Sequence, residues 1–211
     1  MSGIVTDQRP REQKAERLFE VAGRQTGYFT AGQALEAGYD YPLQHYHRKR
    51  GHWTQVGRGL FRLNRYPEGE NEDLVRLYLW SRNREGNPQA VVSHETALRL
   101  YGLSDLMPGK LHLSVPRGFR KRSPRGVVLH KQDLTDGDVE EWTGFRVTTP
   151  LKTILDVARS REISPEHLAS AVREAVARGL FRRKRLREEL SRREDDERCR
   201  IASNATTNCG R

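Results

Sequence analysis

The chain has 211 residues, of which 35% are hydrophobic and 31% are charged, so one large or two small domains with modest cores are expected. No apolar run reaches the roughly 20 residues that span a bilayer. The N-terminus lacks the apolar stretch of a signal peptide, and we therefore expect a cytoplasmic protein. The formal net charge of +10 favours polyanionic partners such as nucleic acid, unless the excess arginine is merely solvated.

The N-terminal part reads as a series of short helices. Residues 1–11 are polar, and we expect them to be flexible. A helix is predicted over 12–23, where apolar residues recur at helical spacing before a glycine. Thr30 and Gln33 match the capping-box pattern and predict a second helix over 31–37.

A third helix and a hairpin follow. The helix is predicted over 41–50, with Pro42 at a tolerated first-turn position. Two short strands then flank a glycine-containing turn at 57–59. Three short helices followed by a hairpin are the layout of a winged helix-turn-helix, which we assign to residues 12–68. A polar break with proline and glycine at 66–72 marks the domain boundary.

The second domain, assigned to residues 72–190, mixes helices and strands. Helices are predicted at 74–80, 94–101, 150–158, 164–178 and 181–190, and strands at 110–115, 126–131 and 145–148. In the first of these strands, apolar residues alternate with His112 and Ser114, which indicates one buried face. The predicted fold class is therefore α+β, with an N-terminal winged helix-turn-helix followed by a mixed α/β second domain. Residues 191–211 have little apolar content and are expected to be a disordered tail.

Basic residues concentrate in the third predicted helix and the hairpin. Helical spacing predicts that Leu43 and Tyr46 face the core and that their polar neighbours point outward. The predicted DNA-binding residues are Gln44, His45, His47, Arg48, Lys49, Arg50, Arg58 and Arg62. Glutamine can pair with adenine, and arginine or lysine with guanine, but the pattern does not say which residues read bases and which contact phosphates. A solvated basic helix is the alternative.

Two further basic clusters lie in the second domain. A possible second basic surface consists of five cations in a loop between two strands, Arg117, Arg120, Lys121, Arg122 and Arg125. This loop can bind phosphates, dock an acidic partner, or simply be solvated. The last predicted helix carries a similar group, Arg182, Arg183, Lys184, Arg185 and Arg187. Like charges this close repel unless solvent or a partner neutralises them.

No catalytic residue is predicted. The run Ser93-His94-Glu95 suggests chemistry, but adjacent residues on a helix diverge, whereas a triad needs converging side chains. We therefore expect Ser93 to cap the helix that follows. Asp156 lies within an apolar helix and is expected to be a buried acid that anchors the helix or pairs with an arginine.

No metal or cofactor is predicted either. His45 and His47 would point about 200° apart on a helix and cannot share one ion. Cys199 and Cys209 are the only cysteines, and their spacing matches no zinc pattern.

Six blocks in order carry a family resemblance: LFEVAGRQTGYFTAGQALEAGY, GHWTQVGRGLFRL, LVRLYLW, SHETALRLYGLSD, KLHLSVP and FRVTTPLKTILDVA. Over roughly residues 15–160 the chain resembles the AbiEi-type antitoxin family of bacterial type IV toxin-antitoxin systems. The resemblance implies a winged helix-turn-helix that binds repeats in its own promoter and represses the operon, through positions that match 44–50 and Arg58 here. It also implies a second domain that counters a nucleotidyltransferase-like toxin without a stable complex.

The leading hypothesis is thus a non-enzymatic, DNA-binding transcriptional repressor that resembles a type IV antitoxin and binds operator repeats as a monomer or weak dimer. The alternative is a protein-interaction module that docks an acidic partner through the loop 117–125. A third hypothesis, an enzyme acting on nucleic acid with Glu95 or Asp156 as its acid, is disfavoured because a nuclease metal site needs several converging carboxylates.

Overall fold

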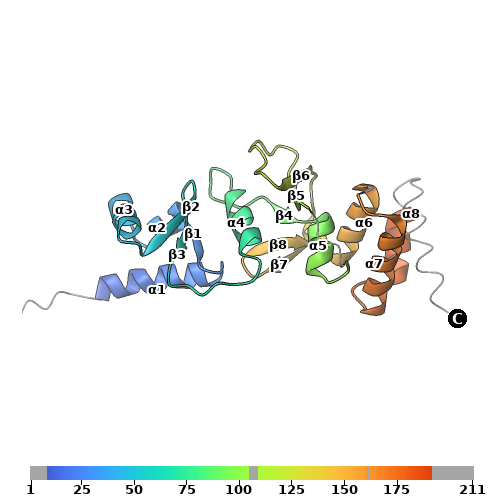
Figure 1. The fold of residues 1–211 in the computed structure, drawn as a ribbon, viewed down its shortest axis with the longest axis horizontal. Coiled ribbons are helices and arrows are strands. Elements are labelled where there is room, and N and C mark those ends of the chain that lie inside the picture. Colours follow the sequence, from blue (N-terminus) through green and yellow to red (C-terminus); the bar gives the residue numbers. More distant parts are fainter. Residues whose placement is uncertain (1–8, 105–108, 161, 192–211) are drawn as a thin grey trace, which may run out of the picture. The chain divides into compact units, whose positions relative to one another are not determined.

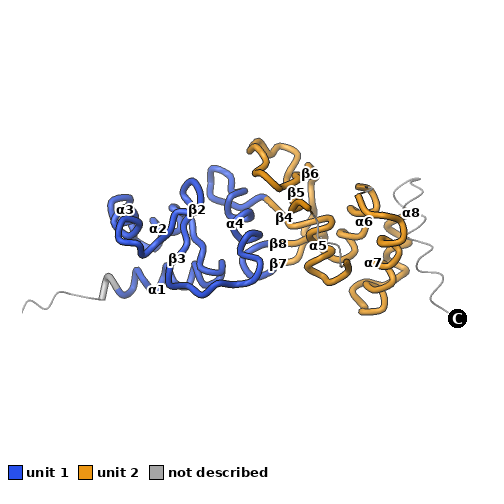
Figure 2. Tube along the Cα trace, in the orientation of Figure 1, with its two compact units in different colours: residues 1–89, 142–145 blue, residues 90–141, 146–211 orange. Residues whose placement is uncertain are grey.

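A computed structural model describes three stretches of the chain, residues 9–104, 109–160 and 162–191. The chain forms two compact units (Figures 1 and 2), which comprise residues 1–89 with 142–145 and residues 90–141 with 146–211. The sequence placed the boundary at 66–72, whereas the structure groups the next helix with the first unit. The tail residues, including Cys199 and Cys209, lie outside the described residues.

The first unit has the element order of a winged helix-turn-helix, as predicted (Figure 1). Its elements are α1 (Arg9–Gly23), β1 (Tyr28–Thr30), α2 (Ala31–Glu36), α3 (Tyr41–Lys49), β2 (Trp53–Gly57), β3 (Leu60–Leu63) and α4 (Glu72–Trp80). The three strands form an antiparallel sheet in the order β1-β3-β2, so that β3 is central. Residues 9–11, expected to be flexible, belong to the first turn of α1.

Local capping fixes the starts of α2 and α3. The predicted capping box is confirmed, since the Gln33 amide donates to Thr30 Oγ1 at 3.2 Å and the Thr30 amide donates to Gln33 Oε1 at 2.8 Å. Asp40 caps α3 by accepting a hydrogen bond of 2.9 Å from the Leu43 amide. These caps fix the start of both helices of the helix-turn-helix.

An aromatic cluster forms the core of the first unit. Phe29 of β1, Trp53 of β2 and Phe61 of β3 are all buried. The Phe29 ring lies 4.8 Å from that of Trp53, edge to face, and 5.7 Å from that of Phe61. Leu18 and Ala22 of α1 pack against the same cluster. The sheet and α1 thus pack together through these three aromatic rings.

The second unit is built on a five-stranded mixed sheet in the order β6-β5-β4-β8-β7. Its elements are β4 (Val91–Val92), α5 (His94–Leu100), β5 (Leu111–Val115), β6 (Val127–Lys131), the 3-10 helix η1 (Asp136–Asp138), β7 (Val139–Trp142), β8 (Phe145–Thr148), α6 (Pro150–Ser160), α7 (Pro165–Ala177) and α8 (Arg183–Ser191). Strand β4 pairs antiparallel with β5 and parallel with β8, and β5 pairs parallel with β6. The mixed α+β prediction is confirmed, although β4 and β7 were not predicted as strands.

Both faces of β5 are buried, which corrects the prediction of a single buried face. Helix α5 packs on β5 and on α6, and α6 packs on α7. His112 and Ser114, on the face predicted to be exposed, retain only 4% and 1% of their accessible surface. His112 and Ser114 are buried because other polar side chains of the second unit pack against this face of β5. The alternation of polar and apolar residues therefore marks a polar interior rather than a solvated face.

Within the described ranges, no helix has the length and apolar character needed to cross a membrane.

Candidate functional site

The exposed side of α3 and its C-terminal end form a basic surface. His45, Arg48, Lys49 and Arg50 are exposed, and α3 itself contains no acidic residue. Tyr46 was predicted to face the core but is 47% exposed, and the Arg50 guanidinium lies 5.5 Å from its ring centre. We call these five residues the α3 surface. The positive charge lies at the C-terminus of the helix, where the helix dipole stabilises cations.

Gln44 does not belong to this surface, so the prediction that it points outward is wrong. Its side chain is 4% exposed. The side-chain amide donates to the backbone oxygens of Tyr39 at 2.8 Å and Ala31 at 3.2 Å. Gln44 therefore ties α3 to α2 and to the turn between them, and cannot reach a base.

His47, also predicted to point outward, is half-buried. Its ring stacks on Trp53 with centroids 4.8 Å apart, and Tyr39 meets it edge-on at 5.2 Å. Its Nδ1 lies 3.0 Å from Nδ1 of His52. Burial and the neighbouring His52 lower the pKa of His47, so the ring packs as a neutral group. His47 anchors the C-terminal half of α3 to the core.

The wing presents one exposed cation on a braced turn. Arg58 is exposed between β2 and β3, and Gly59 beside it has a φ of +58°. Arg82, just after α4, donates to the backbone oxygens of Arg58 at 2.7 Å and Gly59 at 2.9 Å. Burial lowers the pKa of Arg82. Sequence reasoning missed this brace, because only the fold brings Arg82 to a turn 23 and 24 positions earlier.

Arg62 was predicted to contact DNA, but its charge is already neutralised within the first unit. Its guanidinium forms an ion pair of 2.9 Å with Glu72, and both side chains are largely buried. Tyr28 also donates to the Glu72 carboxylate, at 2.8 Å. The hydrogen bond to Glu72 raises the pKa of Arg62. Because Glu72 is the first residue of α4, this ion pair directs the Arg62 side chain towards α4.

The basic loop in the second unit is exposed as predicted. All five cations of the loop are exposed. Arg117 lies 3.4 Å from Asp133, but both side chains are mostly solvated, and such pairs contribute little. The loop thus keeps a strong local excess of positive charge. The basic residues of the last helix lie on and just before α8, where Lys184 is 3.9 Å from Glu188.

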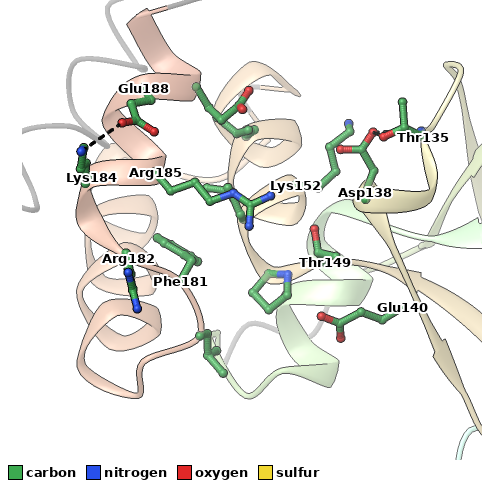
Figure 3. Close-up of a pocket in the computed structure, with 16 residues that line it drawn as sticks. Thr135, Asp138, Glu140, Thr149, Lys152, Phe181, Arg182, Lys184, Arg185 and Glu188 are labelled. Atoms are coloured by element: carbon green, nitrogen blue, oxygen red, sulfur yellow. Dashed lines mark hydrogen bonds and ion pairs between the residues drawn. The ribbon is translucent and has the colours of Figure 1, made fainter.

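A pocket of about 940 Å³ lies between α8, the start of α6 and the segment from η1 to β7. Figure 3 shows Lys152 and Arg185 with the acidic side chains of Asp138, Glu140 and Glu188 around this space. The lining carries both signs of charge.

A buried ion pair lies at the centre of a polar network in the second unit. Lys152 and Asp156, one turn apart on α6, form an ion pair with side chains 6% and 3% exposed. Gln132 bridges them, accepting from Lys152 Nζ at 2.8 Å and donating to Asp156 Oδ2 at 3.1 Å. Its Nε2 also lies 2.7 Å from Ser114 Oγ. Asp156 is thus a buried acid, as predicted, but its partner is Lys152 and not an arginine.

Ser93 and His94 extend this network and correct the prediction that their side chains diverge. His94 has a φ of +52°, so the backbone departs from helical geometry at that residue. Its Nδ1 lies 2.9 Å from Ser93 Oγ, which in turn accepts from Ser114 Oγ at 2.8 Å. The Ser93 side chain makes no capping hydrogen bond to α5. Ser93 has no exposed surface, and burial lowers the pKa of His94 to about 2.

Comparisons with known proteins agree with this architecture. Residues 16–64 match the family described as transcriptional regulator, AbiEi antitoxin, and residues 90–203 match the AbiEi antitoxin C-terminal domain. The crystal structure of the RV2827C protein from Mycobacterium tuberculosis is similar in fold, with a TM-score of 0.57 and 19% identity over 91% of this chain and 76% of that one. No curated protein matches the chain.

The two family matches correspond to the two structural units, one to the winged helix-turn-helix and one to most of the α+β unit. Their descriptions name a transcriptional regulator and an antitoxin, which are regulatory rather than enzymatic roles. The chain therefore belongs to the AbiEi antitoxin family of DNA-binding regulators in toxin-antitoxin systems.

Proposed function

We propose that this protein represses its own promoter as the antitoxin of a type IV toxin-antitoxin system. The first unit binds operator repeats, and the second unit counters a nucleotidyltransferase-like toxin without forming a stable complex with it. The observation that carries the DNA-binding part is the α3 surface, a patch of exposed cations and one exposed tyrosine on the helix that enters the major groove in this fold.

The side chains on this surface suit both kinds of DNA contact. Arg48, Lys49 and Arg50 can donate to guanine edges in the major groove or to phosphates. Arg58 on the braced wing suits a phosphate beside the groove. Gln44 and His47, held in or against the core, keep α3 in position and do not touch the duplex. Arg62 keeps its pair with Glu72.

Binding to the native promoter tests the proposal directly. A labelled duplex from the region upstream of the gene is titrated with the full chain at moderate salt, beside a scrambled duplex of equal length. Replacing Arg48 and Lys49 with alanine should abolish specific binding, since each such contact is worth about 1–3 kcal/mol. Both side chains are exposed, so the circular dichroism spectrum should not change.

A matched control removes the same amount of charge elsewhere. The Arg120→Ala, Arg122→Ala variant loses two exposed cations from the second unit, and it should keep nearly all specific affinity. Equal losses in the two double variants would mean that net charge alone drives binding. Unchanged affinity in the Arg48→Ala, Lys49→Ala variant would place the DNA surface elsewhere.

A second candidate function follows from the exposed basic loop at 117–125, which can dock an acidic partner. Co-purification with the product of the neighbouring gene separates the two functions. A loop-dependent complex that survives purification would favour the docking module. Rescue of growth during toxin expression, with no complex recovered, would favour the antitoxin.

A further inference from the structure

Four side chains of metal-binding types, two glutamates and two histidines, lie near one another in the second unit, each from a different element or connection. Glu95 lies on α5, His112 on β5, His130 on β6, and Glu162 between α6 and α7. Single ligand atoms of Glu95, His112 and Glu162 all lie within 4.8 Å of one another. Nε2 of His130 lies 3.0 Å from Nδ1 of His112, and the same Nδ1 lies 3.4 Å from Glu162 Oε2.

We propose that Glu95, His112, His130 and Glu162 bind one divalent transition-metal ion, with Zn²⁺ as the best-fitting ion. Two imidazole nitrogens and two carboxylates are a donor set that zinc accepts. Calcium and magnesium prefer sites made of oxygen alone. The proposal concerns a structural site with four protein ligands, which would join α5, β5, β6 and the α6–α7 connection.

The two donor separations measured from His112 Nδ1 match those around a tetrahedral ion. Ligand atoms about 2.0–2.1 Å from zinc at tetrahedral angles lie about 3.3 Å apart. The 3.0 Å and 3.4 Å separations around His112 Nδ1 fall on either side of that value. The Glu95 carboxylate is within 4.8 Å of the ligand atoms of His112 and Glu162, and binding of one ion by all four side chains requires Glu95 to rotate towards the other three.

The surroundings hold the two imidazoles in place. His94 stacks on His130 with ring centroids 3.5 Å apart and an interplanar angle of 12°. The His112 amide donates to Thr96 Oγ1 at 2.8 Å, and its carbonyl oxygen accepts from the Ser93 amide at 3.1 Å. Burial lowers the pKa of His130, and the neutral imidazole is the form that binds metal.

The two carboxylates have a reason to accept a cation. Burial raises the pKa of Glu95, and the charge of Glu162 and a hydrogen bond to it act in the same direction. A metal ion between them would replace that repulsion with attraction. The Glu162 side chain is 41% exposed, whereas that of His112 is 6% exposed. Glu162 thus lies on the open side, where an ion would enter from solvent.

Titration of the chelator-treated, untagged full chain with ZnCl₂ tests the site. Calorimetry should show one equivalent bound, and Co²⁺ in place of zinc should give the intense visible absorption of a tetrahedral complex. Zinc should also raise the thermal midpoint of the chain, because it binds the folded state. Replacing the exposed Glu162 with glutamine should weaken binding at least about 100-fold, since even supporting residues typically contribute 10–100-fold.

Three controls separate this site from other zinc donors. Glu174→Gln removes an exposed carboxylate on α7 and should leave binding unchanged. His47→Ala with His52→Ala removes the histidine pair of the first unit, and Cys199→Ser with Cys209→Ser removes both thiols; binding should survive both changes. Absence of zinc binding, its loss in any control, or its full retention in Glu162→Gln would overturn the proposal.

Discussion

The two units use their polar residues in opposite ways. The first unit packs around an aromatic core and exposes cations at the end of α3 and at the wing turn, namely Arg48, Lys49, Arg50 and Arg58. The second unit places polar groups in its interior: of the twelve buried polar or charged residues among those described, nine belong to it. A surface that binds DNA must be free, whereas a buried polar group must be paired. The first unit is thus organised for contact and the second for a unique internal arrangement.

The tryptophans make this comparison measurable. All three, Trp53, Trp80 and Trp142, belong to the first unit. Because Trp142 ends strand β7 of the five-stranded sheet, it is replaced with phenylalanine; the fluorescence of Trp53 and Trp80 then follows the first unit, while circular dichroism follows the whole chain. Two units can unfold separately, so each transition is analysed by itself.

The largest effect is expected from breaking the buried ion pair. Lys152→Met leaves the Asp156 carboxylate buried without its cation and should destabilise the second unit by about 3–5 kcal/mol. Denaturant unfolding followed by circular dichroism measures the loss, and the tryptophan transition should move little. The Lys152→Met, Asp156→Leu double variant should recover most of the stability. A single variant as stable as the wild type would show that the pair does not organise the interior.

The next largest effect is expected from acid, which should lower the stability of the second unit. The folded-state pKa of His94 is lowered to about 2, and that of His130 is also lowered. The unfolded chain therefore binds protons more readily than the folded chain. The stability that these two histidines contribute is full above about pH 6.5 and declines as the pH falls. Glu95, with a raised pKa, acts in the opposite direction.

At pH 5 the contribution of His94 alone should have fallen by about 2 kcal/mol. Denaturation midpoints between pH 7.5 and about 4.5 measure this change. His94→Asn, which tolerates a positive φ, should flatten the profile. An equally steep profile in that variant would assign the pH dependence to other groups.

A smaller effect is expected where the first unit does bury a polar group. Gln44→Ala leaves the carbonyl oxygens of Tyr39 and Ala31 without their side-chain donor and should cost about 1–3 kcal/mol. The tryptophan transition should report the loss. Operator binding should be recovered at protein concentrations and temperatures where the unit is folded. Loss of operator binding in a fully folded variant would indicate that Gln44 contacts DNA directly.

The smallest effects concern the wing, where charge and positioning can be separated. Arg58→Ala should weaken operator binding and reduce the slope of log affinity against log salt by about 1, as expected for one phosphate contact. Arg82→Ala removes the brace but keeps the Arg58 charge, so affinity should fall with a nearly unchanged slope. Identical slopes in Arg58→Ala and the wild type would remove the wing from the interface.

The sequence was informative wherever neighbouring residues decide the structure. The capping box at Thr30 and Gln33 and the glycine turn of the wing involve partners within a few positions. Helical spacing predicted the wrong orientation for Gln44 and Tyr46. The Gln44 side chain is buried because it donates to two backbone carbonyl oxygens, and the Tyr46 side chain is exposed. The period of a helix predicts faces, but it does not predict which face a polar residue with good partners will occupy.

The sequence by itself determined the winged helix-turn-helix, the α+β character of the second unit and the basic character of α3, because these depend on local pattern and composition. Only the tertiary structure decided that Arg62 pairs with Glu72, that Arg82 braces the wing, and that two histidines and two glutamates from four elements meet. The physical reason is that hydrogen bonds and ion pairs act over a few ångströms in space, and folding brings together groups that the chain keeps far apart.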